Sequence, residues 1–345
     1  MPTVTKTKAA PAKTAQSKVE SMFLPFKKNG VQFRNRILAP PTVADHADVD
    51  GKVTPKLIKH YRTLARQGVG TIIVESAYVT KQGRSHVNQL GISEEEHLEG
   101  LENLARGVKK EGAAIGIRIS HAGAQTSESA CGEQPVGPSV LNFGRDFDVS
   151  REFDQGDVEE IILNYVHAAE RAEEVGMDFI EINGTEQQLL DQCCCCVKLN
   201  SRVDEYGSAK IETRMQLAME VVSAIKNRES VKIPISYYFS IFDKIEDGFK
   251  PKDLKSMLIL LENAGVDFFH PLAVHAMNKC FENKEPLCQW SAKYTDIPLI
   301  INGNIKSPQL LDEAATMGCA DWFAMDQSIF ERLQWYQFLK RKISQ

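Results

Sequence analysis

The strongest constraint on the fold of this chain is a series of eight short apolar runs, separated by longer segments. Most of the runs are continuously apolar rather than alternating, which is typical of parallel strands that are buried on both faces. The eight runs are Arg36–Pro41, Gly70–Glu75, Ala114–Ile119, Met177–Asn183, Val231–Tyr237, Val266–Pro271, Ile297–Asn302 and Ala320–Met325.

Helical patterns fill most of the gaps, with apolar residues at intervals of three and four. The predicted helices are Leu57–Arg66, His97–Lys110, Val158–Glu174, Ile211–Asn227, Pro251–Asn263 and Pro308–Thr316. Five glycines stand just before a strand, where a glycine commonly ends a helix in the left-handed conformation. They are Gly68, Gly112, Gly176, Gly265 and Gly318. Asp157, Ser307 and Pro308 are helix-start signals, and the segment 274–296 is less regular.

Eight strand–helix units in series predict a single α/β domain, a closed (β/α)8 barrel. The alternative is a doubly wound open sheet, which is disfavoured because no G-x-G-x-x-G motif follows any of the strands. Active sites of such barrels lie at the C-terminal ends of the strands. The residues directly after each run are therefore the candidates for function.

Composition excludes several classes of protein. The 345 residues are 43% hydrophobic and 25% charged, a balance typical of soluble globular proteins. A net charge of −5 without a basic, aromatic-rich stripe argues against a nucleic-acid partner. No apolar run approaches the ~20 residues that span a bilayer, and the N-terminus has no apolar signal-peptide core. We therefore expect no membrane partner and an intracellular, cytoplasmic location.

The N-terminus and the cysteines fit the same location. Residues 1–20 are almost entirely Lys, Ala, Thr, Pro and Ser, which predicts a disordered tail because little apolar surface can be buried. An organelle-targeting peptide is the alternative, weakened by the lack of arginine. Four of the eight cysteines are consecutive, at Cys193–Cys196. This run indicates a free-thiol loop in a reducing compartment rather than a zinc site, which usually has C-x2-C spacing, so we predict no metal.

Five segments, in order along the chain, resemble the old yellow enzyme family, the FMN-dependent NAD(P)H ene-reductases. They are Phe23–Thr42, Val74–Arg84, Ile115–Gly123 (IGIRISHAG), Phe179–Ile182 and Asn200–Gly207. Together the segments carry the match from about Met22 to Phe330. The resemblance implies a (β/α)8 barrel over residues 21–345, in which the first segment forms an N-terminal β-hairpin cap and the first strand.

The resemblance also implies an FMN site across the barrel mouth, part of which matches. The matching positions, after the first and second strands, are Pro40, Pro41, Thr42 and Ala77. After the third strand the family has a glutamine that hydrogen-bonds the flavin, and this chain has Arg118. An arginine donates hydrogen bonds but cannot accept them, so it cannot copy the pattern of an amide.

After the fourth strand, the family positions for catalysis are occupied by Asn183, Glu186 and Gln188. The family presents a His followed by a His or Asn, which donate to the substrate oxygen, and often a Tyr that supplies the proton. Asn183 can still donate, but an ionised Glu186 only accepts, and the amide of Gln188 is no proton source. His121 is interpreted as a structural histidine.

Two positions that carry positive charge in the family are also replaced. Pro234 aligns with an arginine near the flavin, and a proline should perturb an internal strand. At the FMN phosphate, Gly303 can still offer an amide, but Asp326 and Gln327 replace a Gly–Arg pair. Two unit charges ~4 Å apart interact by about 4 kcal/mol at an effective dielectric of about 20, so a carboxylate here should weaken FMN binding strongly.

The residues that differ from the family's motif concentrate at the barrel mouth, whereas the pattern of strands and helices is intact. We therefore hypothesise a pseudoenzyme, an old-yellow-enzyme-like barrel that has lost FMN-dependent ene-reductase chemistry and acts as a structural or interaction protein with a protein partner or assembly. The alternative is an FMN-dependent NAD(P)H oxidoreductase with an altered active site, and NAD(P)H is expected as a substrate only in that case. A third alternative is a barrel enzyme for another ligand that uses Glu181, Glu186 and Asp326 as acids or metal ligands.

Overall fold

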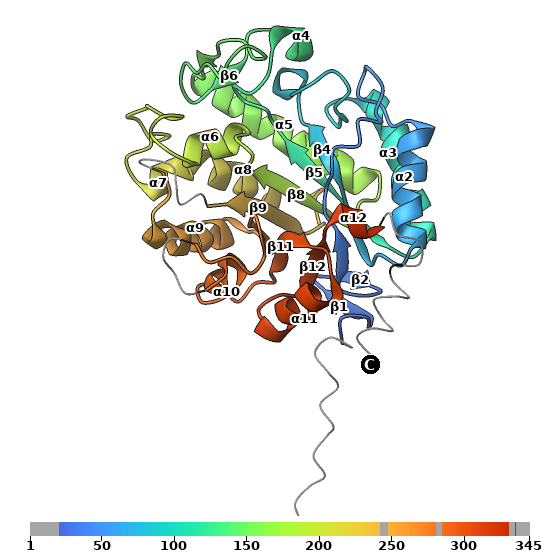
Figure 1. Cartoon of the computed structure of the whole chain (residues 1–345). Helices are drawn as coiled ribbons and strands as arrows, with labels where there is room; N and C mark the ends of the chain where they lie inside the picture. Colours follow the sequence, from blue (N-terminus) through green and yellow to red (C-terminus); the bar gives the residue numbers. More distant parts are fainter. Residues whose placement is uncertain (1–20, 242–247, 281–284, 331–334, 336–345) are drawn as a thin grey trace, which may run out of the picture.

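The computed structural model describes residues 21–241, 248–280, 285–330 and 335. Within these residues, parallel strands close an eight-stranded barrel in the order β10, β11, β12, β3, β4, β5, β8, β9 (Figure 1). The strands are β3 (Ile37–Ala39), β4 (Thr71–Tyr78), β5 (Ala114–Ser120), β8 (Phe179–Gly184), β9 (Ile235–Ser240), β10 (Phe268–Leu272), β11 (Ile300–Ile305) and β12 (Trp322–Met325). The predicted barrel is confirmed, because each of the eight apolar runs contributes one strand.

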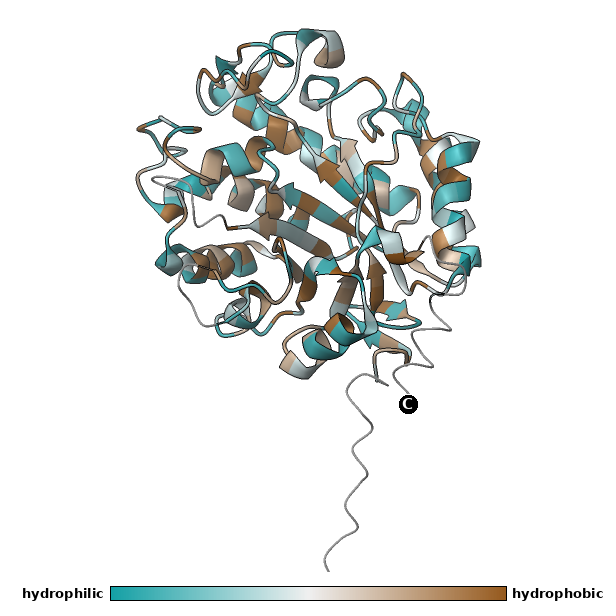
Figure 2. Ribbon diagram, viewed as in Figure 1, coloured by the Kyte–Doolittle hydropathy of each residue, from teal (hydrophilic) through white to brown (hydrophobic). Residues whose placement is uncertain are grey.

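Helices between consecutive strands surround the barrel (Figure 1). The longer ones are α2 (Pro55–Arg66), α3 (Leu98–Lys110), α5 (Gln155–Glu174), α8 (Gln216–Lys226), α9 (Pro251–Ala264) and α11 (Pro308–Met317). Shorter helices are η1 (Lys81–Gly83), η2 (Glu95–His97), α4 (Glu128–Cys131), α6 (Leu189–Cys194), α7 (Ile211–Arg214), α10 (Leu287–Ser291) and α12 (Gln327–Phe330). Figure 2 shows hydrophobic residues on the strands and mixed helix surfaces, as expected when one helix face packs on the barrel.

The helix ends follow the sequence signals, with one correction. The five predicted glycines have φ between 68° and 116°, the left-handed region that glycine tolerates best. Ser307 caps α11, its hydroxyl accepting from the amide of Leu310 at 3.2 Å. Asp157 does not start α5, however. Asp154 is the N-cap, and Asp157 lies three residues later, where each carboxylate accepts from the other's amide in a capping box.

Pro234 does not lie inside a strand, which corrects the expected boundary of the fifth barrel strand. β9 begins at Ile235, one residue after the proline. Pro234 therefore needs no N–H for the ladder, while its carbonyl still accepts from the amide of Ile180 at 3.0 Å. The barrel sheet is not perturbed at this position.

The predicted hairpin closes the N-terminal end of the barrel. β1 (Phe26–Lys28) pairs antiparallel with β2 (Val31–Phe33). The ring centroids of Phe26 and Phe33 are 5.0 Å apart, and Phe33 and Trp322 are also 5.0 Å apart. These rings join a cluster with the first residues of several barrel strands, so the hairpin is the floor of the barrel, opposite the strand ends that carry function.

Two short strands lie in the segment between β5 and α5. β6 (Val136–Gly137) pairs in parallel with β7 (Arg151–Glu152), and the amides of Arg151 and Phe153 bond back to residues 135 and 137. The pairing of β6 with β7 holds the long segment 121–154 near the mouth of the barrel, at the C-terminal end of β5. The segment thereby supplies Gln125 and Phe147 to the site described below.

The cysteine run is partly helical, so the predicted loop is wrong for its first half. Cys193 and Cys194 end α6, and Cys195 and Cys196 follow it. All four thiols are buried and free, and burial raises the pKa of Cys193 to about 12. Residues 1–20 lie outside the described residues. In the part of the chain that the structure describes, no helix is long and apolar enough to cross a membrane.

Candidate functional site

A buried charged network lies inside the barrel toward the mouth. Arg118 on β5, Glu181 on β8 and His270 on β10 have side chains that are 3%, 0% and 0% exposed. Arg118 Nε donates to Glu181 Oε1 at 2.8 Å, and Glu181 Oε2 lies 2.6 Å from His270 Nδ1. Ser236 Oγ donates to the same Oε2 at 3.2 Å. Parallel pairing sets this geometry, because Arg118 and Glu181 are opposite each other in the register.

The network holds its charges in place. Burial raises the pKa of Glu181, but His270 and Arg118 outweigh burial and hold that pKa at about 2. Burial lowers the pKa of Arg118, but Glu181 and its neighbours raise it, so the guanidinium stays charged. His270 Nδ1 faces the carboxylate at 2.6 Å, and its Nε2 lies 3.1 Å from Asn302 Nδ2.

Arg118 is also stacked on an aromatic ring. Its guanidinium carbon lies 3.6 Å from the ring centroid of Tyr238 on β9, a cation–π contact. Tyr238 and Ser236, both on β9, thus meet the charged network, whereas Pro234 precedes the strand. Nη2 of Arg118 approaches Glu181 Oε1 at 2.7 Å without the alignment of a hydrogen bond, and it has no other acceptor among the described residues. The guanidinium is thus ion-paired with Glu181 and stacked on Tyr238.

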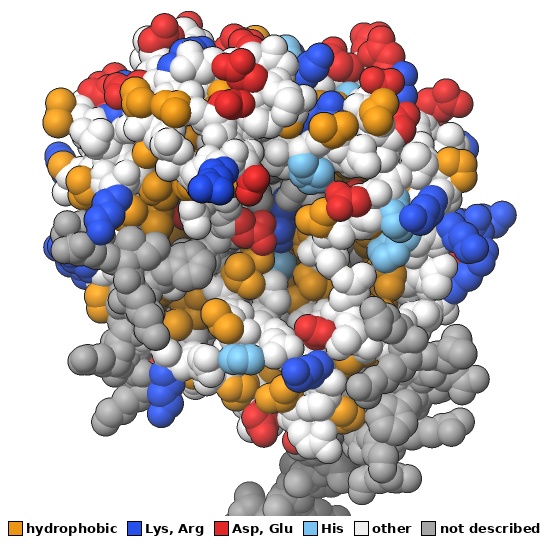
Figure 3. All heavy atoms as spheres, turned by 45° about the horizontal axis from the view of Figure 1, so that its top comes forward, with side chains coloured by type: hydrophobic (Ala, Val, Ile, Leu, Met, Phe, Trp, Pro, Cys, Tyr) orange, Lys and Arg blue, Asp and Glu red, His pale blue; other side chains and the backbone are white. Residues whose placement is uncertain are grey.

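A cavity of about 360 Å³ lies at the mouth, and Glu186, which faces Arg118, is one of its lining residues. Figure 3 shows that the molecular surface has a central hollow, in which acidic, basic and histidine side chains gather. The cavity is lined by Val43, Glu75, Ser76, Ser85, His86, Gln89, Leu90, Gln125, Phe147, Asn183, Glu186 and Gln188. Its volume lies within the range of small-molecule sites, and most of its polar groups are amides and hydroxyls that can orient a ligand.

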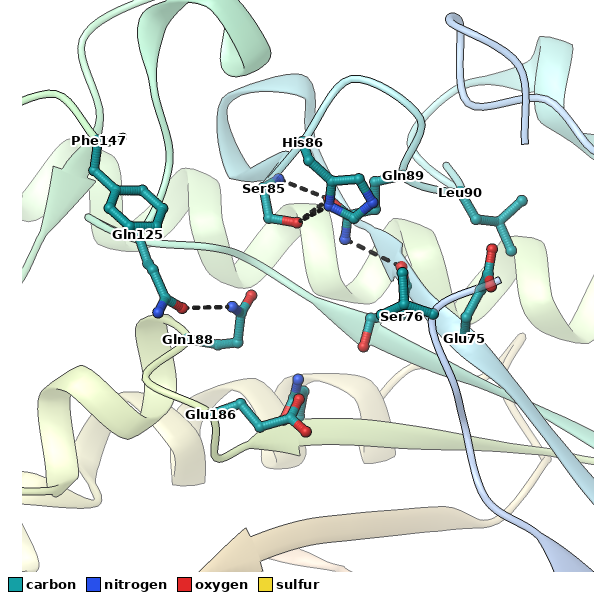
Figure 4. A pocket seen from close by; sticks show the side chains of 12 residues that line it. Glu75, Ser76, Ser85, His86, Gln89, Leu90, Gln125, Phe147, Glu186 and Gln188 are labelled. Carbon is teal, nitrogen blue, oxygen red and sulfur yellow. Dashed lines mark hydrogen bonds between the residues drawn. The ribbon is translucent and has the colours of Figure 1, made fainter. Parts of the chain in front are cut away.

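Figure 4 shows where these side chains come from. Glu75 and Ser76 are on β4, and Ser85 to Leu90 are on the loop that follows it. Ser85 Oγ lies 2.8 Å from His86 Nδ1 and 3.0 Å from Gln89 Oε1, and Gln89 Nε2 donates to the backbone oxygen of Ser76 at 3.1 Å. These bonds hold the loop against the end of β4, so that one wall of the cavity is rigid.

Glu75 is a titratable group that the sequence did not single out. It is 4% exposed, and its Oε2 accepts from the amide of Ala44 at 2.6 Å. Burial raises the pKa of Glu75 to about 7, because that one hydrogen bond does not offset desolvation. A carboxyl group whose pKa is near 7 can donate a proton at neutral pH, where most enzymes work. The only signal for Glu75 in the sequence was its position at the end of the second predicted strand.

The three predicted catalytic positions lie together on the cavity wall. Asn183 is buried, and its Oδ1 accepts from the amide of Thr185 at 3.2 Å, which leaves the amide nitrogen for a ligand. Glu186 has φ +61° and a side chain that is 52% exposed, with Oε2 3.8 Å from Arg118 Nη1. Gln188 Nε2 donates to Gln125 Oε1 at 3.1 Å (Figure 4). Glu186 therefore pairs with the cation of the mouth rather than standing as a lone negative charge.

The positions expected to touch a flavin ring lie at the ends of β3 and β4. Pro40, Pro41 and Thr42 follow β3 and are half-buried, and Thr42 Oγ1 donates to the oxygen of Pro40 at 3.4 Å. Ala77 is fully buried in β4, where the register with β5 shifts. Val43, next to Thr42, lines the cavity, so this turn borders the same opening as Glu75.

The ends of β11 and β12 form the corner at which the resemblance placed the FMN phosphate, and the residues there bond to one another. Asp326 caps α12, its Oδ1 accepting from the amide of Ser328 at 3.0 Å and from Ser328 Oγ at 2.5 Å. Gly303 has φ +143° and its oxygen accepts from the amide of Ala276 at 2.8 Å. Gln327 faces a separate pocket on α2, with Lys56 and Lys59 among its lining residues. A carboxylate at the helix start does not fit a phosphate, whereas the Arg118 side of the mouth fits an anionic ring.

Two further expectations concern histidine and acidic residues. His121 is fully buried, accepts from the amide of Gly123 at 3.0 Å, and has its pKa lowered to about 4 by burial, as suits a neutral structural group. Glu181, Glu186 and Asp326 do not form a metal centre. Glu181 is bound by Arg118 and His270, and no cluster of three or more His, Cys, Asp or Glu in the described ranges could hold an ion.

Comparisons with known proteins place this geometry in context. The model of the NADH:flavin oxidoreductase / NADH oxidase family matches residues 21–345. The chain is 33% identical to an NADH oxidase of Thermoanaerobacter brockii over 88% of the chain and 48% of that relative, so it spans about half the relative's length. It is 30% identical to an NADPH dehydrogenase of Geobacillus thermodenitrificans over 91% of the chain and 92% of the relative.

Solved structures support the same fold. Morphinone reductase superposes with a TM-score of 0.81 at 19% identity, covering 93% of the chain and 90% of the structure. The old yellow enzyme homologue of Zymomonas mobilis gives a TM-score of 0.80 at 20% identity, covering 93% of each. At this level of identity, the likeness shows the (β/α)8 fold alone.

The relatives contradict the hypothesis of a pseudoenzyme that serves as a structural or interaction protein. Relatives at 30–33% identity over most of the chain are an NADH oxidase and an NADPH dehydrogenase, so the hypothesis of lost chemistry is wrong. The physical reason is that the replaced motif residues do not remove the site. The mouth keeps a fixed cation, a titratable acid and a cavity, contributed by Arg118, Glu75 and the loops around them.

Proposed function

The chain belongs to the NADH:flavin oxidoreductase / NADH oxidase family, and we propose that it is a flavin-dependent oxidoreductase with an altered active site. It takes a hydride from NADH or NADPH and passes it to a small, electron-poor acceptor such as an activated alkene. FMN is the cofactor of the family, and NAD(P)H is its electron donor. A flavin held at the mouth supplies the hydride chemistry, and the protein supplies binding, orientation and electrostatics.

The observation that carries the proposal is the buried cation of Arg118, which faces Glu186 on the cavity wall. Its guanidinium is fixed by Glu181 and stacked on Tyr238. A preorganised cation of this kind stabilises negative charge that develops on a bound ring, at little cost of reorganisation. Arg118 thus replaces an amide at this position by a permanent charge, which is a change of mechanism rather than its loss.

The cavity can position an acceptor and supply its proton. The amide nitrogen of Asn183 can donate to a carbonyl oxygen of the acceptor, and Gln188 and Gln125, bonded to each other, line the same cavity. Glu75, with a pKa of about 7, is the group that can protonate the carbon next to the one that receives the hydride. It takes the role for which Gln188 is unsuited.

The test separates the two half-reactions. The flavin-loaded, desalted protein is mixed anaerobically with NADH or NADPH, and the visible absorption of the flavin is followed. We expect bleaching by at least one nucleotide, and return of colour with cyclohexenone or with a quinone. A protein that retains no flavin, or whose bound flavin neither nucleotide reduces, would overturn the proposal.

Glu75→Gln provides a matched control within the same assay. Neither the reduction of the flavin by NAD(P)H nor its reoxidation by a quinone requires Glu75 to protonate a carbon atom. Both reactions should therefore keep their rates. Reoxidation by cyclohexenone should slow by about 100-fold, the lower end of a general-acid contribution. Equal slowing with both acceptors would show that Glu75 shapes the site without donating the proton.

A further inference from the structure

We propose that the flavin site of this chain does not recognise the terminal phosphate of FMN, so that riboflavin binds at least as tightly as FMN. The inference rests on the proposed function, in which a flavin occupies the mouth. It concerns the corner formed by the ends of β11 and β12, where the loops after the seventh and eighth strands of such barrels, with the N-terminus of a short helix, frequently bind phosphate.

Three backbone amides at this corner, those of Asp326, Ser328 and Ile329, already have acceptors within the protein. Asp326 N donates to the oxygen of Ile305 at 2.9 Å, and Ile329 N donates to the oxygen of Asp326 at 3.1 Å. Ser328 N and Ser328 Oγ both donate to Asp326 Oδ1. The protein's own carboxylate therefore takes the place that an anion would take at the start of α12. A phosphate there would have to displace these bonds.

The start of α12 carries a carboxylate at the place where a dianion would bind. Asp326 brings a negative charge to the turn, and Gln327 beside it is neutral. Lys306 is exposed directly after β11, and the cations next to Gln327, Lys56 and Lys59, line a different pocket between α2 and α12. A phosphate at the turn would meet repulsion from Asp326 instead of the charge-assisted hydrogen bonds that normally bind it.

The β11 side of the corner is closed as well. A Cβ atom on Gly303 would lie 2.3 Å from the amide nitrogen of Ala276, so the loop after β10 packs directly on the glycine. Asn304 Nδ2 lies 3.1 Å from His275 Nδ1, which fastens the same loop to the next residue of β11. The glycine here serves close packing of two backbone segments, not the approach of a ligand.

The experiment measures binding, not turnover. The flavin-free full-length protein is titrated with riboflavin and, separately, with FMN, and quenching of flavin fluorescence gives both dissociation constants. We expect the FMN constant to equal or exceed the riboflavin constant. In Asp326→Asn, which keeps the cap but loses the charge, FMN should gain about tenfold relative to riboflavin, while riboflavin binding is unchanged. The double variant Asp326→Gly with Gln327→Arg should gain more.

A matched control is Glu313→Gln, which removes a carboxylate from an exposed position on α11. It should leave the ratio of the two constants unchanged, and circular dichroism should show all variants folded. FMN binding tenfold or more tightly than riboflavin to the unaltered protein would overturn the inference, and loss of that preference in Lys59→Gln would place the phosphate in the α2 pocket. Failure of both flavins to bind would instead overturn the proposed function.

Discussion

Replacing Glu75 with glutamine should change how the stability of the protein depends on pH. The carboxyl group is 4% exposed, and burial raises its pKa from 4.5 to about 7. Glutamine has nearly the same shape and can still accept from the amide of Ala44, which bonds Glu75 Oε2 at 2.6 Å. The variant therefore removes the titration with little change in packing.

The direction in which the free energy of unfolding changes with pH follows from the protons bound in each state. Between the unfolded pKa and the folded pKa, the folded protein holds a proton on Glu75 that the unfolded chain has lost, so the free energy of unfolding falls as pH rises through this window. Ionising the group in the folded state costs about 3 kcal/mol. Glu75→Gln avoids this cost, so its stability relative to the unaltered protein should rise by about 2.5 kcal/mol between about pH 5 and about pH 8.

Urea unfolding followed by circular dichroism at several pH values measures the difference directly. Glu313→Gln is the control, because it makes the same change of side chain at an exposed position. A stability difference for Glu75→Gln that does not change between pH 5 and pH 8 would refute the reasoning, since it would mean that Glu75 titrates alike in the folded and unfolded chains. The proposed role as proton donor would then lose its basis as well.

Three further predictions concern stability and reactivity. Glu181→Gln should lower the free energy of unfolding by about 3–5 kcal/mol, because it leaves Arg118 buried without its charged partner; a loss below about 1 kcal/mol in urea unfolding would contradict this. Gly303→Ala should destabilise by more than about 1 kcal/mol, since φ is +143° and a Cβ would meet Ala276, and an unchanged melting temperature would show that the loop yields freely. Cys193–Cys196 should react with a disulfide reagent only as fast as the protein opens, because all four thiols are buried; immediate reaction of the folded protein would show them accessible.

At the barrel mouth, the effect of single motif residues differs from what each residue suggests by itself. Glu186 alone suggests repulsion of a developing oxyanion, but in the structure it lies 3.8 Å from Arg118 Nη1, so its charge is partly balanced. Pro234 suggests a damaged strand, but the strand begins one residue later and brings Tyr238 to Arg118 instead. Glu186 is balanced by a residue from another strand, a contact that its own segment of the sequence does not reveal.

The sequence by itself determined the barrel, because that information is local. Buried parallel strands need continuous apolar runs, helices need a three-to-four-residue apolar period, and helix ends need residues such as Gly265 and Ser307, all within a few neighbouring positions. Only the tertiary structure decided the site. Arg118, Glu181 and His270 are far apart in the chain, and strand register and barrel closure bring them within hydrogen-bonding distance. The pKa of Glu75 depends on how completely the loops exclude water from it, which is a property of packing and not of any segment.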